Sequence, residues 1–165
     1  MRTVSLLAGW ATEDVHRDFQ RVTDFGQFPA LAPDVRKVAV HPPPTPELAR
    51  DSDWEVSFRR GLLRWNEWES VDPDRLRVEF DQTEGDFESF HGFWQLAAVP
   101  GGAEVRFEAS YDFGIDSLAG ILDPLAERVV KRIVCAVLSA LFGDIRVIEG
   151  GEALTDLAES IARQG

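Results

Sequence analysis

The sequence predicts an α+β fold in which a curved antiparallel sheet of seven strands wraps around one long helix near the C-terminus. Seven short runs between Arg2 and Phe113 alternate apolar and polar residues, and this period of two places one face of each run in the interior. One long amphipathic helix follows, starting near Ser117 and ending at Leu141 or Phe142. Because short turns join successive runs, neighbouring strands are expected to pair antiparallel. A curved sheet closed by one helix is expected to enclose an internal hydrophobic cavity.

Each element has its own signal along the chain. The opening strand at 3–10 is followed by a helix, in which Val15, Phe19 and Val22 recur at helical spacing, and by a short helix or turn at 25–33. The other strands are expected, in chain order, at 35–40, 54–59, 62–71, 75–81, 87–99 and 104–113. Residues 1–143 are predicted to form the domain, and 144–165 a tail with a short amphipathic helix through Leu154, Leu157 and Ile161.

Composition and charge exclude several classes of partner. The chain has 165 residues, of which 44% are hydrophobic, enough for one domain with a real core. Its net charge is −12 and no cluster of Lys and Arg dominates, so binding to nucleic acid or to an anionic membrane is not expected. The long helix carries charged residues from Asp123 to Arg132, so it is not a membrane span. No secretory signal opens the chain and the lone Cys135 has no disulfide partner, which together favour a reducing, cytoplasmic setting.

The aromatic content indicates a pocket for a flat, hydrophobic molecule. The chain has five Trp and eleven Phe but one Tyr, and large rings both fill cores and line binding sites. The predicted ligand-binding wall consists of the strand residues Trp54, Phe58, Trp68, Phe80, Phe90, Trp94 and Phe107 and the helix residues Leu118, Leu122 and Leu125. Each of these side chains taken alone also fits simple core packing.

Several local strings resemble those of a known superfamily. They are 24–29 (DFGQFP) with Pro33 and Val35 following, 71–74 (VDPD), 84–87 (EGDF) leading to Phe93-Trp94, and Gly101-Gly102 before 105–107 (VRF). Together with the element order, these strings are similar to those of the START-like or helix-grip superfamily, also called SRPBCC. Within it, the chain resembles the polyketide cyclase/dehydrase group and the coenzyme Q-binding proteins. The resemblance covers roughly residues 1–143 and implies a START/Bet v 1-like fold with a deep pocket between sheet and helix.

The resemblance also implies which side of each strand faces the pocket. In the strand 62–71, it points Arg64, Asn66, Trp68 and Ser70 inward. The opposite register would bury Glu67 and Glu69, and the free-energy cost of burying unpaired carboxylates favours the first choice. In the strand 87–99, it turns Phe90, Gly92, Trp94 and Leu96 inward and leaves His91 and Gln95 outside.

The predicted catalytic residues are Arg64, Tyr111, Asn66 and Ser70. An inward arginine would place a cation against a ketone or enolate oxygen, as the aromatase/cyclases that this chain resembles do. Tyr111 would donate a proton or hold a carbonyl oxygen, while Asn66 and Ser70 would position a carbonyl or a water. The alternatives are a surface arginine paired with a carboxylate, a core tyrosine, and ordinary strand residues. The three histidines show no metal-site spacing, and no phosphate-binding loop is present, so neither a metal nor another cofactor is expected.

Three functions remain open at this point. The first is an aromatase/cyclase-like enzyme that folds a poly-ketone intermediate and promotes its cyclisation or dehydration. The second is a non-catalytic carrier for a lipid, quinone or polycyclic product, and the third is a module that binds a protein through its acidic face and tail. The expected partner is a hydrophobic small molecule, for which an acyl carrier protein is one form of delivery, and a homodimer stays open as the oligomeric state.

Overall fold

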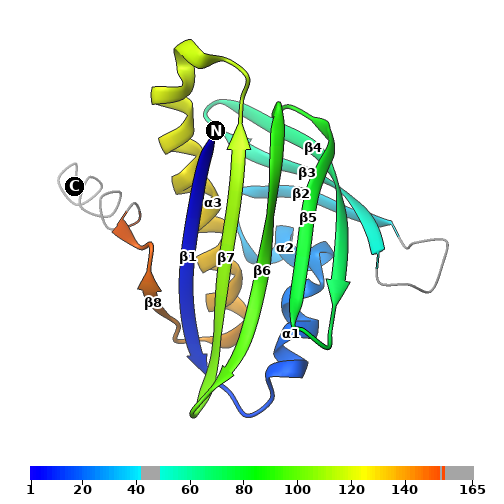
Figure 1. Ribbon diagram of the computed structural model, residues 1–165, viewed down its shortest axis with the longest axis vertical. Helices are drawn as coiled ribbons and strands as arrows, with labels where there is room; N and C mark the ends of the chain where they lie inside the picture. The colour runs from blue at the N-terminus through cyan, green and yellow to red at the C-terminus, as the bar shows by residue number, and fades with distance from the viewer. Residues whose placement is uncertain (42–48, 153, 155–165) are drawn as a thin grey trace.

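An antiparallel sheet of eight strands curves around the helix α3 (Figure 1). The computed structural model describes residues 1–41, 49–152 and 154; Leu157 and Ile161 of the predicted tail helix lie outside them. The strands are β1 (Arg2–Ala11), β2 (Val35–His41), β3 (Ala49–Phe58), β4 (Gly61–Asp72), β5 (Arg77–Gly85), β6 (Ser89–Val99), β7 (Gly102–Asp112) and β8 (Arg146–Glu149). The helices are α1 (Val15–Thr23), α2 (Phe28–Leu31) and α3 (Ala119–Phe142), with short 3-10 helices at Phe25–Gln27 and Asp116–Leu118.

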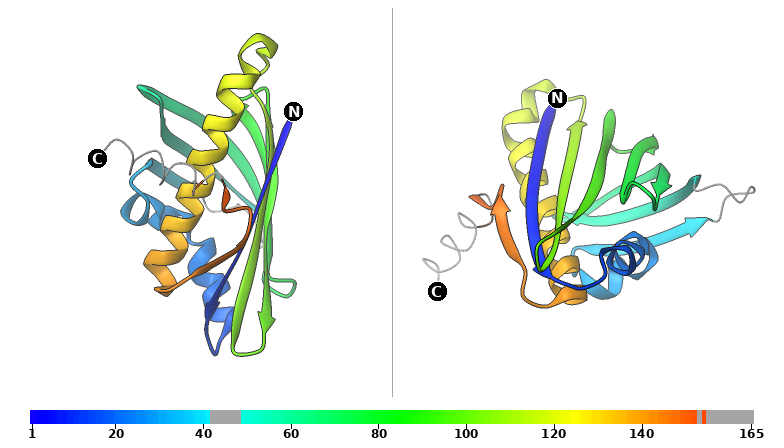
Figure 2. Two further views of the ribbon diagram at one scale, coloured as in Figure 1. Left: turned by 90° about the vertical axis from the view of Figure 1, so that its left-hand side faces the viewer. Right: turned by 60° about the horizontal axis from the view of Figure 1, so that its bottom comes forward.

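The strand order is β2-β3-β4-β5-β6-β7-β1-β8, and all neighbouring strands are antiparallel. The sheet therefore has one strand more than the seven predicted, because residues of the tail form β8 beside β1. The three α-helices lie on one side of the sheet, and its β2–β4 end bends towards them (Figure 2). This confirms the predicted α+β architecture with a helix held in the concave face.

The alternation of residues along β6 and β7 places the predicted side chains in the interior. Phe90, Trp94 and Leu96 of β6 are buried, whereas His91 is exposed, which confirms the predicted register of this strand. On β7, the residues Val105, Phe107, Ala109 and Tyr111 are buried. Gly92 faces the ring of Phe80, and a Cβ atom at this position would come within 2.7 Å of it. The same Cβ atom would overlap the Glu108 carbonyl oxygen of β7, so only a glycine fits at this position.

Helix α3 packs on the sheet through one face and ends at a glycine. Its buried residues include Ala126, Val134 and Val137. Gly143 has a φ of +78°, a left-handed conformation that glycine adopts without strain, and its N–H donates to the Ser139 carbonyl oxygen. Phe142 in the last turn stacks on Trp10 of β1, with ring centroids 4.3 Å apart. This contact ties the C-terminal end of α3 to the sheet.

Candidate functional site

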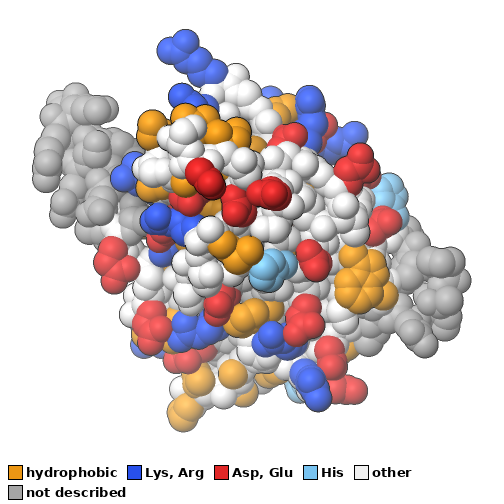
Figure 3. Space-filling model, turned by 45° about the horizontal axis from the view of Figure 1, so that its top comes forward, with side chains coloured by type: hydrophobic (Ala, Val, Ile, Leu, Met, Phe, Trp, Pro, Cys, Tyr) orange, Lys and Arg blue, Asp and Glu red, His pale blue; other side chains and the backbone are white. Residues whose placement is uncertain are grey.

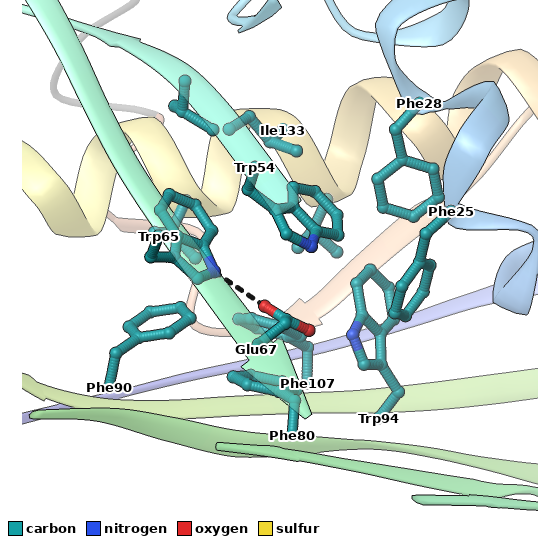
Figure 4. Close-up of a pocket in the computed structure, with 13 residues that line it drawn as sticks. Phe25, Phe28, Trp54, Trp65, Glu67, Phe80, Phe90, Trp94, Phe107 and Ile133 are labelled. Carbon is teal, nitrogen blue, oxygen red and sulfur yellow. Dashed lines mark hydrogen bonds between the residues drawn. The ribbon is translucent and has the colours of Figure 1, made fainter. Parts of the chain in front are cut away.

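A small hydrophobic cavity lies between the concave face of the sheet and α3 (Figure 4). Its volume is about 60 Å³. Eight aromatic rings make up most of its wall, and a single polar side chain, Glu67, reaches into it. The lining residues are Phe25, Phe28, Trp54, Val56, Trp65, Glu67, Phe80, Phe90, Trp94, Phe107, Val130, Ile133 and Val134.

Five of the predicted wall residues line this cavity. They are Trp54, Phe80, Phe90, Trp94 and Phe107. A sixth, Phe58, lines a neighbouring hollow of about 30 Å³ that shares part of its wall with the cavity. The rings pack on one another, with centroids 4.8 Å apart for Trp94 and Phe107 and 5.3 Å apart for Phe80 and Phe90. The structure places these residues around one space; their binding of a ligand remains a prediction.

The helix side of the wall differs from the prediction. Leu118 is exposed, and neither Leu122 nor Leu125 lines the cavity. The first turn of α3 reaches beyond the sheet, and the hydrophobic side chains at this end of the molecule gather at its surface (Figure 3). The helix residues that face the cavity come about two turns later, at Val130, Ile133 and Val134.

The predicted register of β4 is wrong. The side chain of Arg64 is 65% exposed and pairs with Glu55 across 3.3 Å on the outer face of the sheet. Trp68 is 47% exposed, and the Asn66 side chain donates to Asp53 at 2.9 Å. Because side chains alternate along a strand, Ser70 also belongs to this outer face. Arg64, Asn66, Trp68 and Ser70 therefore do not contact the cavity.

The inner face of β4 carries Trp65, Glu67 and Glu69 instead. Glu67 is 3% exposed and Glu69 is fully buried. The cost of burying these carboxylates was the reason for expecting the other register. The structure meets this cost with partners on β3, because Arg50 lies directly opposite Glu69 and Ser52 directly opposite Glu67 in the antiparallel ladder.

Glu69 is held by two donors. The Arg50 Nε donates to Glu69 Oε1 at 2.7 Å, and the Ser52 hydroxyl donates to Oε2 at 2.6 Å. Arg50 also donates to the Thr23 carbonyl oxygen at the end of α1, and its guanidinium lies 4.8 Å above the centre of the Phe25 ring. A buried carboxylate with a charged partner and two hydrogen bonds is tolerated in a low-dielectric interior.

Glu67 has a different environment. The Trp65 indole N–H donates to Glu67 Oε1 at 2.8 Å, the contact drawn in Figure 4. Burial raises the pKa of Glu67 well above its ordinary value, and the neighbouring carboxyl group of Glu69 raises it further. The Trp65 hydrogen bond and the charge of Arg50 act in the opposite direction. The aromatic surroundings and the neighbouring carboxylate thus favour the protonated form of Glu67.

Tyr111 is buried in the sheet and does not line the cavity. Its hydroxyl donates to the Asp123 carbonyl oxygen in α3 at 2.7 Å. Burial raises the pKa of this phenol. These contacts correspond to the core tyrosine that was the alternative to a catalytic role.

Sequence reasoning missed Phe25, Phe28, Trp65, Glu67 and Arg50. The positions of the last three follow from the pairing of β3 with β4 in the structure. Phe58 pairs with Gly61, so a two-residue turn joins β3 to β4. With Trp54 and Val56 turned inward on β3, this turn forces the odd-numbered residues of β4 to face inward as well.

Among the described residues, no group of His, Cys, Asp or Glu is arranged to hold a metal ion, and no helix is long and apolar enough to cross a membrane.

Residues 14–138 match the family described as polyketide cyclase / dehydrase and lipid transport. The chain belongs to this family. Its fold agrees with the predicted START-like superfamily, to which the solved structures below also point. This family includes polyketide cyclases, dehydrases and lipid-transport proteins, so membership establishes the fold and this general kind of protein. No curated protein matches the chain significantly.

Three solved structures illustrate how widely this fold is shared. A protein from Thermus thermophilus has 22% identity and a TM-score of 0.74, with 85% of this chain and 94% of that chain covered. The Zhui aromatase/cyclase from a Streptomyces species has 19% identity and a TM-score of 0.67, with 86% and 92% covered. A START superfamily protein from Mycobacterium smegmatis has 13% identity and a TM-score of 0.66, with 86% and 94% covered. At these identities the likeness establishes the fold alone.

Proposed function

We propose that this protein binds a hydrophobic, carbonyl-bearing polyketide intermediate in the aromatic cavity and promotes its cyclisation or dehydration. The observation that carries the proposal is the cavity itself, where eight rings surround a single buried acid. Flat walls favour stacking of a planar or folded unsaturated chain. Holding a flexible chain in a folded conformation lowers the entropic part of the cyclisation barrier.

Glu67 takes the place of Arg64 as the group that would stabilise a ketone or enolate oxygen. It is the one titratable side chain in the cavity wall, and its raised pKa favours the protonated form that a general acid needs. Hydrogen-bond donation to a ketone oxygen would stabilise the negative charge that develops there during C–C bond formation or loss of water. The surrounding rings exclude water and strengthen this interaction.

The cavity is smaller than its proposed ligand. Pockets for drug-sized molecules usually measure about 300–1,000 Å³, against about 60 Å³ here. A polyketide chain would therefore enter only as wall side chains or α3 move outward. We include in this proposal that the substrate is delivered on an acyl carrier protein and that the protein acts as a homodimer.

A non-catalytic carrier is the second candidate. The apolar lining favours it, because only Glu67 among the lining residues is polar, and binding alone needs no proton donor. Extraction of purified protein with organic solvent would return a lipid, quinone or finished polycycle if the protein is a carrier.

Filling the cavity tests both candidates. Val134 is buried on α3 and faces the cavity, so Val134→Phe should remove binding and turnover of a synthetic linear polyketone thioester. Val147→Phe on exposed β8 is the matched control and should change neither. Cyclised product from the wild type, with none from Val134→Phe, supports the enzyme. Binding without any product supports the carrier, and unchanged binding in Val134→Phe would exclude this cavity for both.

A further inference from the structure

We propose that Glu67 and Glu69 form a buried acid pair that holds one proton, and that Arg50 keeps Glu69 ionised so that Glu67 is the protonated member. The cavity then selects neutral ligands that carry a hydrogen-bond-accepting oxygen and rejects carboxylates. This inference rests on the proposed function only in using the same cavity, and it names the class of ligand that the cavity takes.

A count of charges in the interior leads to this assignment. Two carboxyl groups lie side by side on the inner face of β4, and one guanidinium faces them from β3. One cation compensates one carboxylate, and a second negative charge would stay uncompensated in a low-dielectric site, so one of the two carboxyls carries a proton. A single shared proton makes the group of Glu67, Glu69 and Arg50 electrically neutral.

The contacts decide which carboxyl is ionised. Both oxygens of Glu69 accept hydrogen bonds, one from the charged Arg50 and one from Ser52. Two donors, one of them a cation, favour the charged form of a carboxyl. Glu67 accepts one neutral indole N–H, from Trp65, and lies among aromatic rings. Its raised pKa agrees with this assignment, and an acid kept neutral by an apolar site is able to donate a hydrogen bond at pH 7.

Trp94 supplies a second donor on the same side of the cavity. Its indole nitrogen lies on the edge of the ring that faces Glu67 (Figure 4). A ligand oxygen between Glu67 and Trp94 would accept a hydrogen bond from each, which is the recognition expected for a carbonyl.

The same arrangement disfavours an anion. A carboxylate ligand would enter a low-dielectric site beside the ionised Glu69, and its desolvation and repulsion would not be offset by a free cation in the wall. A cationic ligand would be held well only if Glu67 lost its proton on binding. The preference of the cavity for neutral over charged ligands therefore distinguishes a protonated Glu67 from an ionised one.

Three single-ring probes of similar size test the proposal by equilibrium binding: acetophenone, benzoate and benzylammonium. Acetophenone is expected to bind at least tenfold more tightly than benzoate or benzylammonium at pH 7. Glu67→Gln keeps an N–H donor and should retain acetophenone within about threefold, whereas Glu67→Leu should weaken it about tenfold. Tightest binding of benzylammonium, lost in Glu67→Gln, would overturn the proposal, and so would equal binding of benzoate and acetophenone.

A second measurement does not depend on any ligand. Carboxyl ¹³C NMR of the protein labelled at glutamate should show one protonated side chain at pH 7, whose signal is absent from a folded Glu67→Gln variant. Arg50→Gln should shift the titration of this pair, which a purely structural arginine would leave unchanged. If the probes bind as expected but no polyketone is cyclised, the proposed function fails and the acid pair stands. If the protein cyclises the polyketone but Glu67 is ionised, the proposed function stands and the acid pair fails.

Discussion

Individual side chains show where sequence reasoning reached its limit. Trp54, Phe80 and Trp94 could be assigned to the interior because each lies on a strand with clear alternation. Arg64 was assigned to the same interior on the cost of burying Glu67 and Glu69. That cost is real, but Arg50 lies in a segment for which no strand was expected before residue 54. Because Arg50 was not recognised as the partner of Glu69, the wrong face of the whole strand was predicted to point inward.

The protonation of Glu67 makes stability depend on pH. Its folded-state pKa lies above the unfolded value near 4.5, so the native state binds the proton more tightly. Wild-type stability is therefore expected to fall as pH rises from 4.5 towards the folded-state pKa, by about 1.4 kcal/mol per pH unit. Glu67→Gln should lack this decline.

Urea unfolding between pH 4.5 and 8 checks the expectation. The difference in unfolding free energy between Glu67→Gln and the wild type should grow in favour of the variant with rising pH. Glu84→Gln, which changes an exposed carboxyl on β5, serves as the control and should run parallel to the wild type. Parallel curves for Glu67→Gln would mean that Glu67 is ionised in the folded protein.

Among the elements, the hairpin between β3 and β4 decides the site. Its two-residue turn, Arg59 and Arg60, sets the pairing of Trp54 with Trp65 and so brings Glu67 into the cavity. Such turns usually carry Asn or Gly because their residues adopt positive φ values. The pair of arginines gave no turn signal, and the expected start of the second strand at Leu62 left the register open. Residues with strong periodicity were placed correctly, whereas an atypical turn was not.

The turn itself is under strain that a substitution should relieve. Arg59 has a φ of +56°, which costs an L-residue about 1 kcal/mol. Arg59→Gly is expected to raise the free energy of unfolding by about 0.5 kcal/mol after the entropy of glycine is subtracted. Arg60→Gly removes the same charge at a position without a positive φ and should lower stability slightly. Chemical denaturation of the two variants checks the pair, and equal effects would contradict the argument.

For the molecule as a whole, the order of elements and the hydrophobic pattern were sufficient to predict a sheet holding a long helix. The eighth strand was not predictable in the same way, because β8 has only four residues and all are exposed. The attachment of α3 also depends on contacts between distant segments. Glu127 of α3 accepts from Arg2 of β1 at 2.6 Å and from Lys131 at 2.8 Å, and Arg132 pairs with Asp34 before β2 at 2.6 Å.

Breaking the buried part of this attachment should be costly. Burial alone would raise the pKa of Glu127, but the hydrogen bonds from Lys131 and Arg2 outweigh it and lower the pKa. Glu127→Gln leaves the nearly buried Lys131 without its carboxylate and is expected to cost about 3 kcal/mol of stability at neutral pH. Because the folded-state pKa lies below the unfolded value, this contribution is present above about pH 4.5 and is lost as pH falls.

Thermal and urea unfolding at pH 7 and pH 3 measure this effect. Glu79→Gln removes the exposed partner of Arg77 and should cost less than about 1 kcal/mol at either pH. A loss for Glu127→Gln no larger than that of Glu79→Gln would show that these ion pairs do not hold the helix.

The pairing of β8 with β1 also affects how copies of this protein meet. A strand at the border of a sheet exposes unpaired N–H and C=O groups, to which a strand of another molecule is able to add. β8 covers three residues of β1, Leu7, Ala8 and Gly9, while β2 lies at the opposite border with β3 as its one neighbour among the described strands. Edge-to-edge aggregation through the described part of the chain would therefore favour β2, whose seven residues form a longer border than the four of β8, and truncation before residue 146 would expose the border of β1 instead.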